Sequence, residues 1–298
     1  MCRFTEEYEV HSFLSPCLFG DILFCQARGD QRNMAAKVID VNAALSQYSK
    51  PVHQRVGEDV YMERQVNRIL SADSKYPMSN ILTMHSDFEE DGKLVMVFDY
   101  CAKGDLFAKI NDGNVSAAQV RRYFSEIVHG VKNLHSRGFS HRDLSLENIL
   151  LDDNDHCLLF DFGLAVPHNS KYNNAVGKEF YMAPEVYRRE TYDPSVADMW
   201  SLGVILVILL TGSPPFRVPC TRSPHYNLVL EQGIAGLFKA WEEEVSPSAV
   251  DLLSHLLVPA KERYTLKQVL GHPFVRSPSF SRRLSKFFKK WTKKEKSF

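Results

Sequence analysis

Residues 141–148 read His-Arg-Asp-Leu-Ser-Leu-Glu-Asn. This segment indicates the fold of the chain more strongly than any other. Thirteen residues after its last member the chain reads Asp161-Phe162-Gly163. Asp143 is a carboxylate that can accept a hydroxyl proton, and the amide oxygen of Asn148 can coordinate a metal ion. The two stretches together therefore hold one candidate base and two candidate metal ligands.

The segment between these stretches predicts a hairpin. Residues 149–151 and 157–160 are short apolar runs, and the Asp152-Asp153-Asn154-Asp155 sequence between them favours a turn, because short polar side chains stabilise turn backbones. Such a hairpin returns Asp161 to the side of Asn148. A base held next to two metal ligands is suited to phosphoryl transfer, which depends on positioning and on electrostatic stabilisation.

Further short motifs follow in a fixed order along the chain. They are Ala36-Lys37-Val38, Ala183-Pro184-Glu185, Asp198-Met199-Trp200-Ser201-Leu202-Gly203 and Arg263. Each motif alone is weak evidence, but the ordered set is specific. Over about residues 8–275 the sequence resembles the eukaryotic protein kinases of the serine/threonine type.

The resemblance implies an α+β fold in two lobes. Residues 8–98 would form a small lobe, an antiparallel β-sheet with one main helix, and residues 105–275 a larger, mainly α-helical lobe, with a hinge at residues 99–104. Residues 1–7 are expected to be an N-terminal leader, and residues 276–298 a C-terminal tail. A length of 298 residues and a hydrophobic content of 44% suit one such unit.

Two apolar patterns support the helical lobe. Between Gln119 and His135, one helical face carries Val120, Tyr123, Phe124, Ile127, Val128, Val131 and Leu134. The longest apolar run, Leu202 to Leu210, contains Gly203 and is too short for a membrane span. We therefore expect it to be a buried helix, and we expect no transmembrane segment.

The net charge of zero hides an uneven distribution. Of the 36 Lys/Arg and 36 Asp/Glu residues, the stretch 276–298 holds nine Lys/Arg and one Glu, which leaves 27 basic and 35 acidic residues in 1–275. The body of the chain is therefore acidic and the tail is strongly basic.

The cysteines and the first residues of the chain bear on its location. The six cysteines show no C-x-x-C pattern and no disulfide framework, which is typical of reduced thiols. The sequence opens without a secretory signal or a myristoylation motif. We therefore expect a cytoplasmic protein.

The resemblance places nucleotide-binding residues in the small lobe. Ser15, Cys17 and Gly20 align with the three glycines of the family's phosphate loop, and Ile22 aligns with the apolar residue that follows them. Because glycines let backbone N–H groups approach phosphates closely, the loss of two of them predicts a stiffer phosphate cover. Lys37 follows on an apolar strand, where a buried cation needs an anionic partner.

The partner of Lys37 is expected on the next helix. Glu63 is the preferred candidate, because it begins a stripe of apolar residues at helical spacing. Asn67, four residues on, is polar where the family places an apolar side chain, so Glu58 stays open as the alternative.

The resemblance assigns the adenine end of the pocket to the hinge. The backbones of Asp99 and Cys101 would hydrogen-bond adenine, and Ala35 would line the same pocket. The bulky Phe98 would limit the space behind adenine, so we expect poor access for inhibitors that need that space.

Two departures from the family pattern lie near the candidate base. Ser145 replaces the lysine that the family places two residues after the catalytic aspartate, and Lys178 replaces the threonine that follows Gly177. By family geometry these two positions touch. We therefore predict that Lys178 reaches over Ser145 and supplies the missing cation, since the charge that develops on the transferred group must be stabilised.

The expected function is transfer of the γ-phosphate of ATP to serine and threonine hydroxyls of proteins. By resemblance Asp143 and Lys178 are the catalytic residues, and Asn148 and Asp161 hold Mg²⁺, so ATP and Mg²⁺ are the expected cofactors. The alternative is a pseudokinase, a scaffold that binds ATP or proteins without transfer. Retention of Lys37 together with the base and both metal ligands favours catalysis.

The activation segment lacks the usual phosphorylated threonine. Asn174 stands at that position, although Arg142, which would read a phosphate, is present. Only Ser170 and Tyr172 offer hydroxyls, so loop phosphorylation and constitutive order both stay open.

Glu185 and Arg263 are expected to form the buried ion pair that ties this segment to the large lobe in the family. Removing either partner would leave an uncompensated buried charge.

Substrate preference is suggested by two carboxylates. Asp105 and Glu147 match acidic positions that engage an arginine upstream of the target residue in basophilic kinases. Solvated surface carboxylates would look the same in the sequence. We expect protein substrates with Ser or Thr, with an upstream Arg as the favoured context.

The tail combines basic residues with apolar residues at helical spacing, namely Phe280, Leu284, Phe287, Phe288 and Trp291. Such a helix can bind a calmodulin-like protein, an anionic membrane or the chain's own kinase cleft, or it can pack on the large lobe. No motif that reads nucleic acid accompanies it, so specific nucleic-acid binding is not expected.

Overall fold

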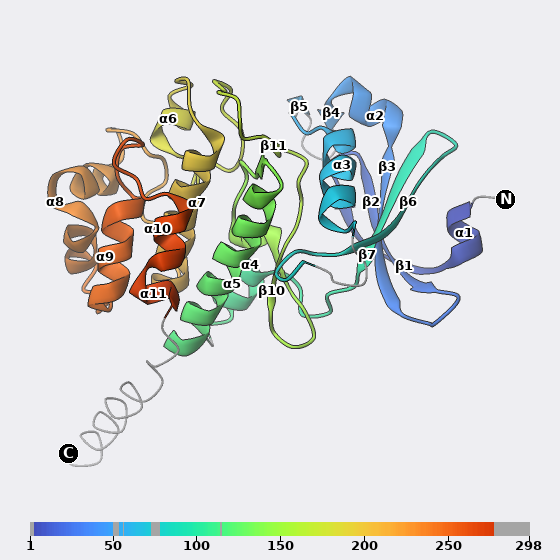
Figure 1. The fold of residues 1–298 in the computed structure, drawn as a ribbon, viewed down its shortest axis with the longest axis horizontal. Helices are drawn as coiled ribbons and strands as arrows, with labels where there is room; N and C mark the ends of the chain where they lie inside the picture. Colours follow the sequence, from blue (N-terminus) through green and yellow to red (C-terminus); the bar gives the residue numbers. More distant parts are fainter. Residues whose placement is uncertain (1–2, 50–53, 56, 73–77, 114, 277–298) are drawn as a thin grey trace, which may run out of the picture.

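The computed structural model describes residues 3–49, 54–55, 57–72, 78–113 and 115–276, and residues 277–298 of the C-terminal tail lie outside these ranges. The chain forms two lobes, one built on a β-sheet and one built of helices (Figure 1). The segment after β7 connects them. This is the two-lobed α+β architecture that the sequence predicted.

The small lobe is a five-stranded antiparallel sheet in the order β1-β2-β3-β7-β6. Its strands are β1 (Tyr8–Cys17), β2 (Gly20–Ala27), β3 (Asn33–Asp40), β6 (Met84–Glu90) and β7 (Lys93–Asp99). The interior strand β7 is buried over five consecutive residues, because apolar groups cover both of its faces.

One face of this sheet is covered by α3 (Val60–Leu70) (Figure 1). The helix begins at Asp59, whose side chain accepts hydrogen bonds from the N–H groups of Tyr61 and Met62. Arg64 and Arg68 of the helix bind Asp87 of β6, which fixes the helix against the edge of the sheet.

Smaller elements complete the lobe. They are α1 (Arg3–Glu7), α2 (Val41–Ser46) and the short paired strands β4 (Tyr48–Ser49) and β5 (Gln54–Arg55). Phe4 of α1 is buried against Tyr8 and Phe88. Residues 3–7 are therefore packed onto the small lobe, whereas the sequence suggested only a leader before residue 8.

The large lobe is mainly helical. Its helices are α4 (Leu106–Asn111), α5 (Ala117–Ser136), α6 (Pro184–Tyr187), α7 (Pro194–Thr211), α8 (Pro224–Ala240), α9 (Pro247–Leu256), α10 (Leu266–Gly271) and α11 (Pro273–Arg276). The apolar face predicted for 119–135 is the buried face of α5, which begins with a capping box at Ser116.

The apolar run at 202–210 belongs to α7, the central helix of this lobe. By length and composition α7 could cross a membrane, yet 72% of it is buried inside the structure. Its neighbours include α5 and α9, and Gly203 lets Leu256 and Leu257 approach its backbone. The buried core helix that the sequence predicted is confirmed.

Short strands flank the segments that hold Asp143, Asn148 and Asp161. They are β8 (Phe139–Ser140), β9 (Ile149–Leu151), β10 (Cys157–Leu159) and β11 (Val166–Pro167), with the 3₁₀ turn η1 (Leu146–Asn148) before β9. β9 and β10 pair antiparallel, from Leu151 opposite Cys157 to Ile149 opposite Leu159. This is the predicted hairpin, with Phe160 just beyond its second strand.

Candidate active site

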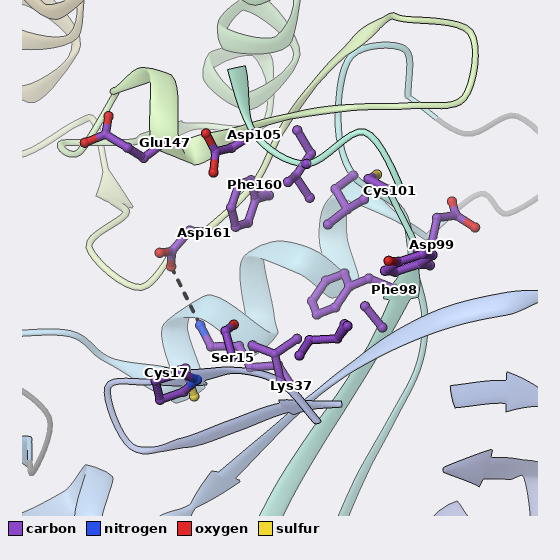
Figure 2. A pocket seen from close by; sticks show the side chains of 18 of the residues that line it. Ser15, Cys17, Lys37, Phe98, Asp99, Cys101, Asp105, Glu147, Phe160 and Asp161 are labelled. Carbon is purple, nitrogen blue, oxygen red and sulfur yellow. Dashed lines mark ion pairs between the residues drawn. The ribbon is translucent and has the colours of Figure 1, made fainter. Parts of the chain in front are cut away.

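A cavity of about 640 Å³ lies between the lobes, and we call it the interlobe cavity. Figure 2 shows Lys37 and Asp161 facing each other at one end, with Phe98 and Asp99 at the hinge end. Residues predicted to hold a nucleotide line it: Ser15, Cys17, Ile22, Ala35, Lys37, Glu63, Asp99, Cys101 and Asp161. Of the residues predicted to hold a nucleotide, Gly20 is the one that does not line this cavity among the described residues.

The cover of this cavity is the β1–β2 hairpin. Strand pairing continues to Cys17 opposite Gly20, so only Leu18 and Phe19 form the turn. Phe19 is buried in the small-lobe core, which anchors the tip of the hairpin. A paired and anchored hairpin fits the stiffer phosphate cover expected from Ser15 and Cys17.

Gly20 is the only one of the three family glycines that this chain retains, and the structure gives the reason. A Cβ at this position would lie 2.0 Å from the carbonyl oxygen of Val38 and 3.2 Å from the Cα of Ile39 on β3. Backbone atoms cannot move away as the end of a side chain can. Gly20 is therefore required for the packing of β2 on β3, independently of any bound phosphate.

Lys37 pairs with Glu63, not with Glu58. The Lys37 ammonium donates to Glu63 Oε1 at 2.7 Å and to Oε2 at 2.8 Å, and Glu63 is almost fully buried. Burial alone would lower the pKa of Lys37, but Glu63 and Asp161 raise it above its usual value. The polar Asn67 is accommodated because its side-chain amide donates to the carbonyl oxygen of Glu63.

Glu58 instead occupies the wall of the interlobe cavity near Gly163. A Cβ on Gly163 would lie 3.0 Å from Glu58 Oε2, and the N–H of Asp59 donates to the carbonyl oxygen of Gly163. Burial and the neighbouring Asp161 raise the pKa of Glu58 to about 8. The backbone hydrogen bond from Asp59 to Gly163 ties the start of α3 to the Asp-Phe-Gly segment.

Asp161 presents an unused oxygen to the cavity. Its Oδ1 is buried without a hydrogen-bond partner among the described residues and lies 3.7 Å from the Lys37 ammonium. Burial would raise the pKa of Asp161, but Lys37 and His141 outweigh burial and lower it. The backbone φ of 62° holds the residue in the left-handed region that carboxamide and carboxylate side chains tolerate best.

Asn148 faces the same region. Its side-chain nitrogen donates to the carbonyl oxygen of Asp143 at 2.7 Å and to Asp143 Oδ2 at 2.8 Å, so its side-chain oxygen is left as an acceptor. No group of three His, Cys, Asp or Glu in the described residues could hold a metal alone. An amide oxygen and a carboxylate fit Mg²⁺, which usually takes one or two protein ligands and completes its shell with phosphates and water.

Asp143 is held by hydrogen bonds to both carboxylate oxygens. Oδ1 accepts from the N–H of Lys178 at 3.0 Å, and Oδ2 accepts from Asn148. Gly177 is needed for this contact, because a Cβ there would lie 2.6 Å from the carbonyl oxygen of Arg142, and its φ is 90°. The candidate base is thus positioned by the segment that follows the activation segment.

The Lys178 side chain reaches Ser145, as the two family departures predicted. Its ammonium donates to Ser145 Oγ at 2.7 Å and lies 3.5 Å from Asn148 Oδ1 and 3.6 Å from Asp143 Oδ2. A cation therefore lies beside the candidate base and a candidate metal ligand. It comes from a different segment than in the family pattern.

Asp198 organises the catalytic loop, a role that the sequence analysis did not assign. Its carboxylate accepts from the backbone N–H groups of His141 and Arg142 and contacts His135 Nε2 at 2.8 Å. The available signal was a charged residue inside the apolar α7, which must be paired when it is buried.

The guanidinium group of Arg142 is bound by neutral groups of the activation segment, with no phosphorylated residue among them. Its guanidinium donates to the Leu164 carbonyl oxygen at 2.8 Å and to Asn174 Oδ1 at 3.1 Å, and it lies over the Tyr172 ring. Tyr172 also pairs with Tyr192 through backbone hydrogen bonds. The activation segment is ordered here by neutral groups around one arginine.

The ion pair predicted between Glu185 and Arg263 is present and buried. Arg263 donates to Glu185 Oε1 at 2.7 Å and Oε2 at 3.2 Å, and its guanidinium lies over the Trp200 ring. It also donates to the carbonyl oxygens of Val258 and Val196.

The far end of the interlobe cavity contains the two carboxylates considered for substrate binding. Asp105 caps α4 by accepting from the N–H of Ala108. Glu147 accepts from the Tyr181 hydroxyl at 3.1 Å and lies 4.0 Å from the Lys178 ammonium. Figure 2 shows both on the side of the cavity away from Ser15 and Cys17.

Comparison with known proteins identifies the same family that the sequence motifs indicated. Residues 8–275 match the family described as the protein kinase domain. The chain is similar to CBL-interacting serine/threonine-protein kinase 15 of Arabidopsis thaliana, with 34% identity over 258 residues, 85% of this chain and 56% of that protein. It is also similar to CBL-interacting protein kinase 5 of Oryza sativa subsp. japonica, with 29% identity over 273 residues, 90% of this chain and 55% of that protein. The chain spans about half the length of these relatives.

Proposed function

This chain belongs to the protein kinase family, serine/threonine type, and on that premise we propose that it transfers the γ-phosphate of ATP to serine and threonine hydroxyls of proteins. The observation that carries the proposal is the Lys37–Glu63 pair facing Asp161 in the interlobe cavity. Beside it, the carbonyl oxygen of Asn148 accepts from the backbone N–H of Phe160, which precedes Asp161, and the Asn148 side chain donates to Asp143. Phosphoryl transfer would use Lys37, Asp143, Asn148 and Asp161 for positioning and charge stabilisation.

Each residue has a defined part in this proposal. Asp143 would orient the substrate hydroxyl and take up its proton, since both of its carboxylate oxygens are fixed by hydrogen bonds. Lys37 would bind phosphate oxygens with a charge that Glu63 keeps in position. Mg²⁺ held by Asn148 and Asp161 would neutralise charge on the phosphates. Lys178 would add the cation that Ser145 cannot supply.

We propose a basophilic preference for the same site. Glu147 and Asp105 place two carboxylates at the end of the interlobe cavity away from Lys37. Glu147 already contacts Tyr181 and Lys178, so Asp105 would provide the greater part of the attraction for an upstream arginine. A peptide series with Arg moved along the upstream positions, assayed against Asp105→Asn and Glu147→Gln, tests this assignment.

A cytoplasmic location is part of the proposal. The cysteines of the described residues, Cys17, Cys25, Cys101, Cys157 and Cys220, are all free thiols, which supports a reducing compartment.

The first experiment is phosphate transfer from Mg-ATP to a basic Ser/Thr peptide. We expect transfer by the wild type and its loss in Asp143→Asn, while the exposed control Glu244→Gln keeps the wild-type rate. A wild type that binds ATP and transfers no phosphate would identify the chain as a pseudokinase scaffold.

A further inference from the structure

A second cavity, of about 900 Å³, lies on the opposite side of the hinge from the interlobe cavity, and we call it the hinge groove. Its walls come from the hinge residues 99–102, the β9–β10 turn, residues 78–83 and Glu126 of α5. The hinge is the only wall that it shares with the interlobe cavity among the described residues, so a ligand here would leave Lys37 and Asp161 accessible.

Four carboxylates line the groove, Asp99, Glu126, Asp152 and Asp153, and we call them the acidic rim. Arg32, which pairs with Asp30, also lines it, and Asp99 contacts His85. Asp152 accepts backbone N–H groups of its own turn, and Glu126 accepts from the N–H of Cys157 and contacts His156. Asp153 has no hydrogen bond or ion pair with any residue that the structure describes. Burial, followed by the negative charges of Asp99, Asp152 and Asp153, raises the pKa of Cys101 to about 12.

The floor between these carboxylates is partly apolar. Met78, Ile81, Ala102 and Leu158 contribute to the lining, alongside the ring of Tyr100. A ligand that fits both features carries positive charge and an apolar face. This is the composition of an amphipathic basic segment.

The chain itself contains such a segment. Residues 277–298 hold eight Lys/Arg and one Glu, with Phe280, Leu284, Phe287, Phe288 and Trp291 at helical spacing. The described part of the chain ends at Arg276 in α11, which packs on α5: the Phe124 and Phe274 rings are 5.9 Å apart, and Arg121 donates to the Pro273 carbonyl oxygen.

The tail can reach the groove from this position. Phe124, under α11, and Glu126, on the groove wall, are about 3 Å apart along the axis of α5 but on opposite sides of it, so the tail would pass around this helix. The 22 residues after Arg276 span about 33 Å even when fully helical. Attachment also gives the tail an effective concentration on the order of millimolar at nearby sites.

We propose that residues 277–298 dock in the hinge groove of their own chain. The lysines and arginines pair with the acidic rim, with Asp153 as the available carboxylate, and the apolar residues cover the floor. The carboxylates at the interlobe cavity are poorer partners, because Glu147 already contacts Lys178 and Asp105 caps α4. The docked tail lies behind the hinge and does not compete with a nucleotide.

Zero-length carbodiimide cross-linking of the full chain, followed by mass spectrometry, tests the placement. The reagent joins a lysine to a carboxylate only when the two are in contact. We expect cross-links from Lys286, Lys289 or Lys290 to Asp153, Asp152 or Glu126, unchanged on dilution and on addition of Mg-ATP. Cross-links to Asp105 or Glu147, cross-links between two chains, or no cross-links from the tail would each overturn the proposal.

A charge reversal on the groove gives a second measurement. Asp153→Lys changes an exposed turn residue, and we expect trypsin to cleave the tail about fivefold faster, since one surface charge contact contributes roughly 1 kcal/mol. The matched control Glu244→Lys makes the same change in the α8–α9 loop and should leave the cleavage rate unchanged. Equal rates in the wild type and both variants contradict docking in the groove.

Discussion

Lys178 puts a cation beside Asp143 by a route that differs from the family pattern. The family places the lysine on the catalytic loop itself, whereas here it comes from the segment after Gly177 and rests on Ser145. The position of the charge is therefore coupled to the order of the activation segment. A loop that is displaced would remove the base's hydrogen bond from the Lys178 N–H and the cation together.

Removing this cation should slow the chemical step. We expect Lys178→Ala to lower kcat about a hundredfold with little change in KM for ATP, since the charge acts on the transferred group. The double variant Ser145→Lys with Lys178→Thr restores the family arrangement and should recover most of the lost rate. Lys171→Ala, which removes a lysine paired with Asp193, is the control, and an unchanged kcat in Lys178→Ala contradicts the role.

The buried Glu185–Arg263 pair should be essential to stability. Arg263→Ala leaves Glu185 without its cation, and we expect a loss of about 3–5 kcal/mol in the free energy of unfolding. Urea unfolding of both single variants and of Glu185→Leu with Arg263→Met measures this. A double variant much more stable than either single one would show that the unpaired charge causes the loss.

At the scale of elements, the sequence predicted the helices and turns that have a local pattern of apolar or polar residues. The apolar stripe of α5, the apolar run in α7 and the turn at Asp152–Asp155 each reflect a local pattern, and each element is present. The packing of α1 was missed because a five-residue helix shows no period, and Phe4 is its only buried residue. The place of Glu58 and the role of Asp198 depend on contacts between distant segments, which local patterns do not encode.

The activation segment should stay ordered without phosphorylation. Asn174, Tyr172 and the Leu164 carbonyl oxygen satisfy Arg142, so phosphatase treatment should leave peptide phosphorylation unchanged. Asn174→Ala removes a hydrogen bond to a charged group, worth about 1.5–3 kcal/mol, and should speed proteolysis within residues 164–176. Loss of activity after phosphatase treatment alone contradicts this account.

The attachment of α3 to β6 should depend on pH. Burial alone would raise the pKa of Asp87, but hydrogen bonds from Arg68 and Arg64 outweigh it and lower that pKa. A lowered carboxylate pKa stabilises the fold above the unfolded value, and this stabilisation is lost as the pH falls through the folded value. We expect Asp87→Asn to lower the Tm at about pH 7, and we expect the difference from the wild type to shrink as the pH falls below the unfolded value of about 3.9. A difference in Tm that is constant with pH contradicts the assignment.

At the scale of the whole molecule, the interlobe cavity joins groups from both lobes. Lys37 and Glu63 belong to the small lobe, and Leu150 and Asp161 belong to the large one. A ligand that contacts all four holds the lobes together and must raise the stability of the folded state by mass action.

Thermal unfolding reports this coupling whether or not phosphate is transferred. At a concentration of Mg-ATP about 100 times its Kd, we expect a gain of about 2.7 kcal/mol. Asp161→Asn should lose the part of the gain that depends on Mg²⁺, whereas Glu243→Gln should keep it. An identical Mg²⁺ dependence in wild type and Asp161→Asn would remove Asp161 from the metal site.

The close approach of Gly20 to β3 determines which substitutions the β1–β2 hairpin tolerates. The three aligned positions are under separate constraints, because Ser15 and Cys17 face the cavity while position 20 meets the backbone of β3. In a saturation library, positions 15 and 17 should accept many small residues and tune nucleotide affinity by degrees. Position 20 should accept glycine alone, whether the selection is for activity or for expression of folded protein. A phosphate loop can thus diverge widely and still keep the one glycine that its sheet requires.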